Sequence, residues 1–344
     1  MKRLSIVLIA AAMLVSAASG LELKDGRMRL VIDDRNGRFA LYYLEDVTRN
    51  RYVPLLYAEE TRTTYPTLVF DQKTYKLGDA SDFRVTVARD GPSGARIEFK
   101  SSFCVVKQTF AFVTSPGAAM SDGVLISFSM ENVAQKDAPI GLRLLFDTWL
   151  GEKAQAHFRA QSAGALLGET ILSGDFKDAW VRSSGDADAA SSLAGLQVQL
   201  AAPSTKPDRL VAANWKRLND SAWSFEASPS RNFTLLPYSI NDSALALYYD
   251  PVVVRPGSTR GVSIFLSQSN DGYPVDASGA AAIGPSITAP SETAPLDEMV
   301  DLIAVRNVLE AINAAIASGV EVSEAQRQEL EAILSRLEAR KAKY

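Results

Sequence analysis

The sequence predicts a mainly β protein, in which a large antiparallel sandwich of two sheets is followed by a linker and a C-terminal α-helical hairpin. From residue 21 to about 265, short segments rich in β-branched and aromatic residues alternate with Gly, Pro, Asn and Asp, which is typical of all-β proteins. After residue 295 the apolar residues recur at a helical period. We therefore expect a leader at 1–20, a β domain at 21–270, a flexible Pro/Ala/Ser linker at 271–295 and a helical hairpin at 296–344.

The first twenty residues have the pattern of a secretory signal peptide. Lys2 and Arg3 precede an apolar run at 4–15, and small residues such as Ala18 and Gly20 follow. A run of about twelve apolar residues is too short to cross a bilayer of about 30 Å as a helix. We expect cleavage, a periplasmic or secreted protein, and no stable membrane span afterwards; an uncleaved anchor is the alternative.

The net charge argues against nucleic acid as a partner. Without Lys2 and Arg3 the 36 basic residues fall to 34, against 40 acidic residues, so the net charge goes from −4 to −6. The basic residues form no stripe along the sequence, and a basic stripe is the usual mark of a nucleic-acid surface.

The chain contains one histidine and one cysteine, which excludes several kinds of site. Zinc needs three or four nitrogen or sulfur ligands, so one copy of the chain cannot hold it in a site of that kind, and we expect no metal ligand. Phosphate-binding loops and dinucleotide fingerprints are absent, so we expect no cofactor. Cys104 lies in an apolar segment and should be buried and inert. His157 should be an exposed loop residue, with a role as general base as the alternative.

The β domain is predicted from a series of short strands with few residues between them. Around 33–38 an Asn-Gly turn separates the first two strands. The predicted strands are 29–32, 39–43, 67–70, 83–88, 95–99, 103–112, 124–130, 142–146, 196–200, 209–213, 243–249 and 259–265. They are too many for a sandwich of about seven strands, which favours a larger one.

The last fifty residues predict two amphipathic helices. Ser318 and Gly319 end the first helix, and Ser323 with Gln326 forms a capping box that begins the second. Two isolated helices bury little apolar surface, so their faces should pack on the β domain, on another copy, or on an envelope protein. The residues expected to bind the partner are Leu296, Val300, Ile303, Leu309, Ile312, Leu330, Leu334 and Leu337.

Several motifs, in order along the chain, resemble a module of bacterial secreted and cell-envelope proteins. The motifs are GRFAL at 37–41, SMENV at 129–133, IGLRLLFDTWLG at 140–151, PDRLVAANW at 207–215, NDSALALYYDP at 241–251 and RPGSTR at 255–260. The resemblance implies a β-supersandwich of the galactose-mutarotase-like type, but no settled activity. This chain has Glu152-Lys153-Ala154-Gln155 where such modules usually have an Asn-Asp-Gly turn. Mutarotases of this fold use a histidine acid and a glutamate base.

The candidate ligand-binding residues lie in these motifs. Arg143, Asp147 and Trp149 alternate and should share one face of a strand, either as a buried structural pair of Arg and Asp or as a sugar-binding face. The same two interpretations, a structural role or a role in ligand binding, apply to Asn214, Trp215 and Asp242. Their structural alternatives are a buried aromatic core and an Asx-turn before a strand.

Paired carboxylates are a further source of chemistry. Glycoside hydrolysis uses two of them at separations of about 5 to 9 Å. Glu59, Glu60 and Glu152 are candidates, although Glu59 and Glu60 would point to opposite faces if they lie on a strand.

Two functions are consistent with these observations. The first is a non-catalytic exported envelope protein with no assigned catalytic residue, in which the β domain is a scaffold and the helices associate with a partner or with themselves. The alternative is a carbohydrate-binding or carbohydrate-modifying protein with a glycan as ligand. Two converging carboxylates beside an exposed tryptophan would favour the alternative.

Overall fold

A computed structural model describes residues 20–59, 63–115, 118–153, 157–185 and 194–269. The predicted signal peptide, the linker at 271–295, and the helical hairpin at 296–344 with its eight partner-binding residues lie outside the described residues, apart from Gly20. Their roles stay predictions. Within the described ranges no helix has both the length and the apolar character needed to cross a membrane.

The described strands form three antiparallel sheets. The four-stranded sheet contains, in order, β1 (Gly20–Asp25), β2 (Met28–Asp33), β3 (Phe39–Asp46) and β4 (Arg51–Pro54). The nine-stranded sheet has the order β13 (Gly164–Leu166), β12 (Phe158–Ala160), β15 (Trp180–Ser184), β16 (Gly195–Gln199), β19 (Thr259–Gln268), β10 (Gly123–Asn132), β9 (Cys104–Val113), β8 (Gly94–Lys100) and β7 (Arg84–Asp90). The six-stranded sheet has the order β14 (Thr170–Ser173), β17 (Arg209–Asn214), β18 (Ser243–Val254), β11 (Ala138–Thr148), β5 (Tyr65–Phe70) and β6 (Lys73–Lys76).

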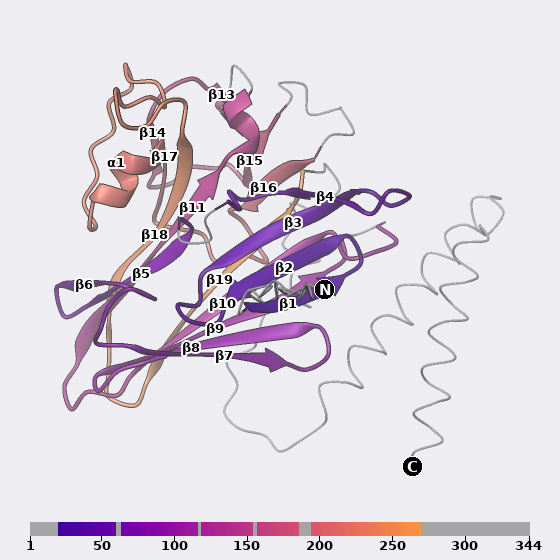
Figure 1. Ribbon diagram of the computed structural model, residues 1–344. Helices are drawn as coiled ribbons and strands as arrows, with labels where there is room; N and C mark the ends of the chain where they lie inside the picture. The colour runs from indigo at the N-terminus through magenta and orange to yellow at the C-terminus, as the bar shows by residue number, and fades with distance from the viewer. Residues whose placement is uncertain (1–19, 60–62, 116–117, 154–156, 186–193, 270–344) are drawn as a thin grey trace, which may run out of the picture.

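The mainly β prediction is confirmed, and every predicted strand overlaps a strand of the structure. The described helices are only α1 (Trp215–Asp220) and the short 3-10 helix η1 (Leu150–Lys153). The structure has three sheets instead of the predicted two, because the first four strands pair only with one another. Figure 1 shows this N-terminal sheet as a layer of its own beside the strands of the nine-stranded sheet.

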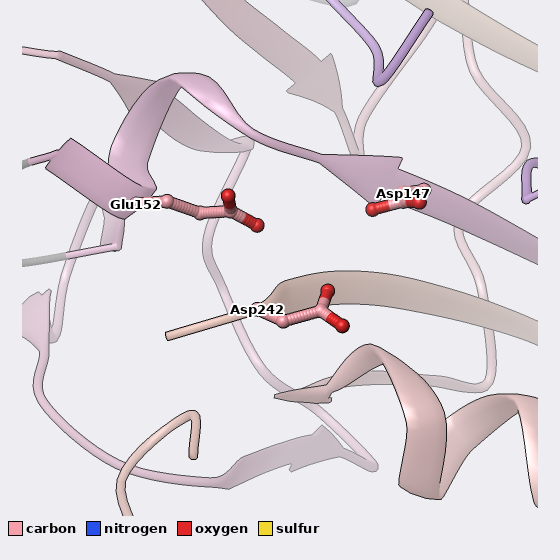
Figure 2. A group of neighbouring side chains, drawn as sticks. All are labelled: Asp147, Glu152 and Asp242. Atoms are coloured by element: carbon pink, nitrogen blue, oxygen red, sulfur yellow. The ribbon is translucent and has the colours of Figure 1, made fainter. Parts of the chain in front are cut away.

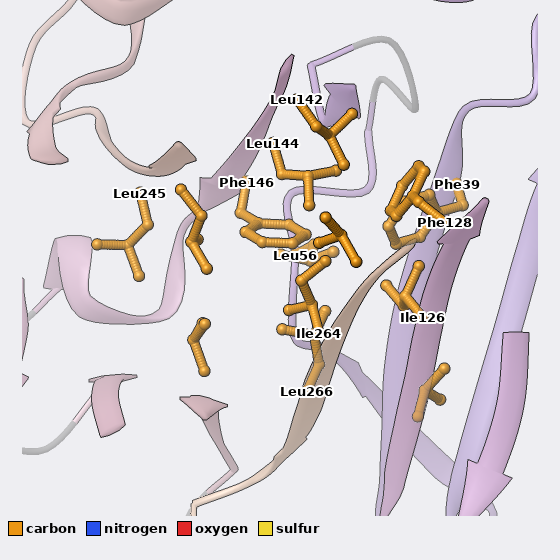
Figure 3. Close-up of a cluster of buried hydrophobic side chains, with 14 of the residues drawn as sticks. Phe39, Leu56, Ile126, Phe128, Leu142, Leu144, Phe146, Leu245, Ile264 and Leu266 are labelled. Atoms are coloured by element: carbon orange, nitrogen blue, oxygen red, sulfur yellow. The ribbon is translucent and has the colours of Figure 1, made fainter. Parts of the chain in front are cut away.

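A single hydrophobic core joins the three sheets. Phe39 of the four-stranded sheet meets Phe110 of the nine-stranded sheet edge to face, with ring centroids 5.0 Å apart. Leu144 of the six-stranded sheet belongs to the same cluster (Figure 3). Cys104 is fully buried in it, and burial raises the pKa of its thiol to about 12. The prediction of a buried cysteine is therefore confirmed, and the thiol is protonated at neutral pH.

The predicted Asn-Gly turn connects β2 to β3. Gly37 has a φ of +71°, and its N–H donates to the carbonyl of Asp33 at 2.8 Å. A Cβ at this position would lie 2.8 Å from the side chain of Ile97. Glycine is thus required by both the left-handed backbone and the close approach of β8.

A smaller cluster covers the other face of the six-stranded sheet. Leu145, Val211 and Tyr248 are buried there, and Leu218 of α1 packs against them. Figure 1 shows α1 beside β17, at the end of the sheet where β11 finishes and β18 begins. The candidate site lies at this end.

Candidate functional site

Three carboxylates from three separate segments converge where β11 ends and β18 begins. Asp147 is the second-last residue of β11, Glu152 lies in η1, and Asp242 directly precedes β18. The two strands pair antiparallel with Asp147 opposite Ala244, which brings these ends together. One oxygen of each carboxylate lies within 4.8 Å of the other two (Figure 2). We call Asp147, Glu152 and Asp242 the carboxylate cluster.

Hydrogen bonds fix each acid in place. The side chain of Asp147 is bonded to the side chain of Thr63, and its backbone N–H donates to the hydroxyl of Thr64 at 3.0 Å. Glu152 Oε1 accepts from the backbone N–H of Ser243 at 3.1 Å. Asp242 Oδ2 accepts from the hydroxyl of Ser239 at 2.6 Å. The acids are therefore held on a rigid frame at the ends of two core strands.

The carboxylate cluster forms no ion pair with any cationic side chain that the structure describes. None of the ion pairs found in the described part of the chain includes Asp147, Glu152 or Asp242. Burial raises the pKa of Asp147 to about 8, and the charges of Asp242 and Glu152 add to this effect. Burial, with the charge of Asp242, raises the pKa of Glu152 to about 7, and burial also raises that of Asp242. Near neutral pH the cluster thus contains both a protonated and an ionised carboxyl group.

His157 lies next to the cluster in a loop, as expected, but the expectation that it is exposed is wrong. It directly precedes β12 and is only 6% exposed, with its ring 4.4 Å from that of Phe233. Its Nε2 is 2.9 Å from Oδ1 of Asn241, whose Nδ2 donates to the backbone carbonyl of Glu152. Burial lowers the pKa of His157, so the ring is neutral at pH 7. The histidine is tied to the cluster through Asn241.

Gly151 explains how η1 comes so close to His157. A Cβ on Gly151 would collide with the backbone carbonyl of His157, and its N–H donates to the hydroxyl of Ser183 at 3.1 Å. A larger residue at 151 would displace the backbone of the neighbouring Glu152.

Arg143 does not form the predicted pair with Asp147. Its Nη1 donates to the carbonyl of Ser221 at 2.7 Å, to the hydroxyl of Ser221 at 3.1 Å and to the carbonyl of Leu218 at 3.3 Å. These acceptors lie at the C-terminal end of α1, where carbonyls lack helical partners. Arg143 is 1% exposed and holds the helix on the sheet.

The two candidate tryptophans support the site from outside. Trp149 lies beyond the end of β11 and packs against the main core, so it does not share the face of Arg143 and Asp147 as predicted. Its Nε1 donates to the carbonyl of Pro54 at 2.8 Å, and Nε1 of Trp215 donates to the carbonyl of Thr63 at 3.0 Å. Both indoles are half-buried. They fix the last residue of β4, Pro54, and Thr63 in the segment just before β5, which also carries Thr64.

Asn214 is fully buried and joins α1 to the segment before β18. Its Oδ1 caps the helix by accepting from the N–H of Arg217, while its Nδ2 donates to the carbonyls of Phe233 and Asp242 and to the hydroxyl of Ser239. Among the described hydrogen bonds, the side chain of Asp242 bonds Ser239, and the predicted Asx-turn is not found.

The structure thus brings Asp147 and Asp242 together, and places Trp149, Asn214 and Trp215 around them as supports. The sequence makes Glu152 a candidate only as a partner of Glu59 or Glu60, but Glu59 is exposed and Glu60 lies outside the described residues. Sequence reasoning missed that Glu152 joins the two aspartates. The signal available was that acids follow the end of one predicted strand, in FDTWLGE, and precede the start of another, in NDS. As a donor set, three carboxylates also suit a hard divalent cation such as Ca²⁺ or Mg²⁺.

No protein-family model matches the sequence, and no curated protein matches it. Among solved structures, the chain is similar to a galactose mutarotase-like protein from Lactobacillus casei, with 10% identity over 72% of this chain and 99% of that one, and a TM-score of 0.42. A galactose mutarotase-like protein from Clostridium acetobutylicum gives 12% identity over 73% and 95% of the two chains, again with a TM-score of 0.42. A heparan sulfate lyase from Pedobacter heparinus gives 11% identity over 75% of this chain but 36% of the lyase, with a TM-score of 0.40. The similarity is to galactose mutarotase-like β-sandwich proteins, and it concerns the fold alone.

Proposed function

We propose that the chain acts on a carbohydrate with a free reducing end, by proton transfer between the carboxylate cluster and the sugar. The observation that carries the proposal is the convergence of Asp147, Glu152 and Asp242 within 4.8 Å at the end of a rigid sheet. The ring oxygen and the anomeric hydroxyl of an aldose are bonded to the same carbon atom. Two carboxyl groups as close as these are suited to exchange protons with both oxygens at the same time.

In this reaction one carboxyl group donates a proton to the ring oxygen while another removes the proton of the anomeric hydroxyl. The bond between the anomeric carbon and the ring oxygen breaks, giving the open-chain aldehyde. Reclosure after rotation reverses both proton transfers and gives the other anomer. Proton donation from Asp147 and acceptance by Glu152 agree with their pKa values of about 8 and about 7.

The spacing also argues against one related reaction. Inverting glycoside hydrolysis needs carboxyl groups about 6.5 to 9.5 Å apart to leave room for a water molecule. One oxygen of each acid in this cluster lies within 4.8 Å of the other two, which is closer than that arrangement requires.

Polarimetry of freshly dissolved α-galactose, α-glucose and α-glucuronate tests the proposal. We expect the protein to accelerate the approach to the equilibrium rotation, and Asp147→Asn, Glu152→Gln and Asp242→Asn each to lower the rate by about a hundredfold. The rate should be highest between the pKa of Glu152, about 7, and that of Asp147, about 8. Glu226→Gln is the matched control, since Glu226 is exposed and outside the cluster.

Two outcomes would contradict the proposal. In one, the wild-type protein does not accelerate the anomer exchange of any of the three sugars beyond the rate in buffer alone. In the other, a chelator abolishes the activity and Ca²⁺ restores it, which would replace proton transfer by cation binding at the same three acids.

A further inference from the structure

A hollow lies in the connection between α1 and β18. It has a volume of about 380 Å³ and is lined by Ser228, Ser230, Arg231, Asn232 and Thr234. The volume falls within the range of about 300 to 1,000 Å³ that small-molecule sites occupy. We call it the loop cavity.

The residues that line the loop cavity are polar, and one of them is positively charged. Their functional groups are three hydroxyls, one amide and one guanidinium, with no carboxylate among them. Hydroxyls and amides both donate and accept hydrogen bonds, which suits the hydroxyls of a sugar. Arg231 is exposed, and no ion pair of the described residues includes it. The guanidinium is therefore available to bind an acidic group of a ligand.

The wall of the loop cavity is held by buried contacts. The backbone N–H of Ser228 donates to Oε2 of Glu169 at 2.9 Å, and the N–H of Glu169 donates to the carbonyl of Arg231 at 2.9 Å. Glu169 is 1% exposed and forms an ion pair with Arg217. A Cβ on Gly168 would lie 2.7 Å from the carbonyl of Pro229, so the loop packs closely on this segment. The cavity is thus formed before any ligand binds, which lowers the entropic cost of binding.

The loop cavity and the carboxylate cluster are joined by one short segment. The hydroxyl of Thr234 accepts from the backbone N–H of Asn241 at 3.0 Å, and Nδ2 of Asn241 donates to the carbonyl of Glu152. The backbone N–H of Asp242 donates to the carbonyl of Phe233 at 3.0 Å. One wall of the cavity is therefore in direct contact with the residues that position two of the three acids.

We propose that the loop cavity binds an anionic saccharide, with Arg231 paired to its carboxylate or sulfate group and the hydroxyls of Ser228, Ser230 and Thr234 bonded to its sugar hydroxyls. The inference rests on the proposed function, for which it names the substrate class. The carboxylate cluster itself repels anions, so the acidic group binds on the Arg231 side of Asn241 and away from the three acids.

The test is an NMR titration of the full chain with glucuronate, a sulfated glucose, glucose and inorganic sulfate, following the backbone amide signals of residues 228 and 230–234. We expect at least one acidic sugar to bind about tenfold more tightly than glucose. Arg231→Gln should remove this advantage, and Arg231→Lys should keep most of it. Arg255→Gln is the matched control, because Arg255 is an exposed arginine in the turn between β18 and β19.

Equal affinity for both acidic sugars and glucose would overturn the inference, as would an advantage that survives in Arg231→Gln. Inorganic sulfate binding as tightly as the sulfated sugar would leave only a simple anion site, and would overturn it too. These results are independent of the proposed function, which polarimetry of the cluster variants tests. Normal anomer exchange with no preference for acidic sugars would reject the loop cavity alone.

Discussion

Arg143 and Asp147 lie four residues apart on the same face of β11, and both are almost completely buried, but their surroundings are opposite. Arg143 donates three hydrogen bonds to Leu218 and Ser221 at the end of α1. Asp147 faces Glu152 and Asp242, whose charges are of its own sign. Arg143 thus meets hydrogen-bond acceptors that stabilise its positive charge, whereas Asp147 lies beside two acids that disfavour its ionised form.

This difference separates a structural residue from a candidate functional one. A buried charge with hydrogen-bond partners stabilises the fold only modestly, but is costly to disrupt. Like charges gathered at one point destabilise the fold, and such gatherings occur at sites where a ligand or a proton compensates them. The two positions should therefore respond to mutation in opposite directions.

The largest effect is expected for Arg143→Leu. The carbonyl of Ser221 would lose its bond from Arg143, and the carbonyl of Leu218 would keep only the hydroxyl of Ser221, so we expect the free energy of unfolding to fall by about 3 kcal/mol. Urea unfolding followed by tryptophan fluorescence measures this, with Arg255→Leu as the exposed control, expected to change stability by less than about 0.5 kcal/mol. A loss as small as that of the control would show that Arg143 does not hold α1.

The opposite effect is expected for Asp147→Asn, and it depends on pH. The pKa of Asp147 is about 8 in the folded protein, above its ordinary value of 3.8, so the folded state binds more protons and stability falls as pH rises through that interval. The variant should match the wild type only below about pH 3.8, where the carboxyl is protonated in the folded and unfolded states alike. At pH 5 the unfolded wild type is already ionised, so the variant should be slightly more stable, and at pH 9 this advantage should be larger by at least about 2 kcal/mol.

Thermal unfolding at both pH values checks this prediction. Glu226→Gln should leave the difference between the two pH values unchanged, since Glu226 is exposed. If Asp147→Asn were destabilising at pH 9, the carboxylate would have a cation or donor partner that neutralises it, and the contrast with Arg143 would disappear.

The sequence predicted the long strands well, because alternation over six or more residues seldom occurs outside a strand. It did not predict strands of three or four residues such as β12 (Phe158–Ala160) and β13 (Gly164–Leu166), whose patterns cannot be told from those of loops. Strand alternation also placed Arg143 and Asp147 on one face correctly. It failed for Trp149, because β11 ends one residue earlier and the alternation stops with it.

The candidate site was only partly predictable for a related reason. Asp147 and Asp242 stand next to strong strand patterns, so their positions follow from the pairing of β11 with β18. Glu152 and His157 reach the site through η1 and the loop after it, where the close approach of Gly151 to His157 depends on tertiary packing. No local pattern encodes that contact, and so the buried histidine was expected on the surface.

The smallest effect is expected for His157, which touches the site only through Asn241. His157→Phe keeps an aromatic ring against Phe233 but removes the bond from Nε2 to Asn241 Oδ1, so we expect a loss of stability of about 1 kcal/mol. Because Asn241 also holds the backbone of Glu152, loosening it should admit water and lower the pKa of Glu152 from about 7. An NMR titration of the carboxyl signals measures this shift, and His157→Gln, which can still bond Asn241, should restore part of it. A Glu152 pKa that is the same in the wild type and in His157→Phe would show that the histidine packs beside the cluster without positioning it.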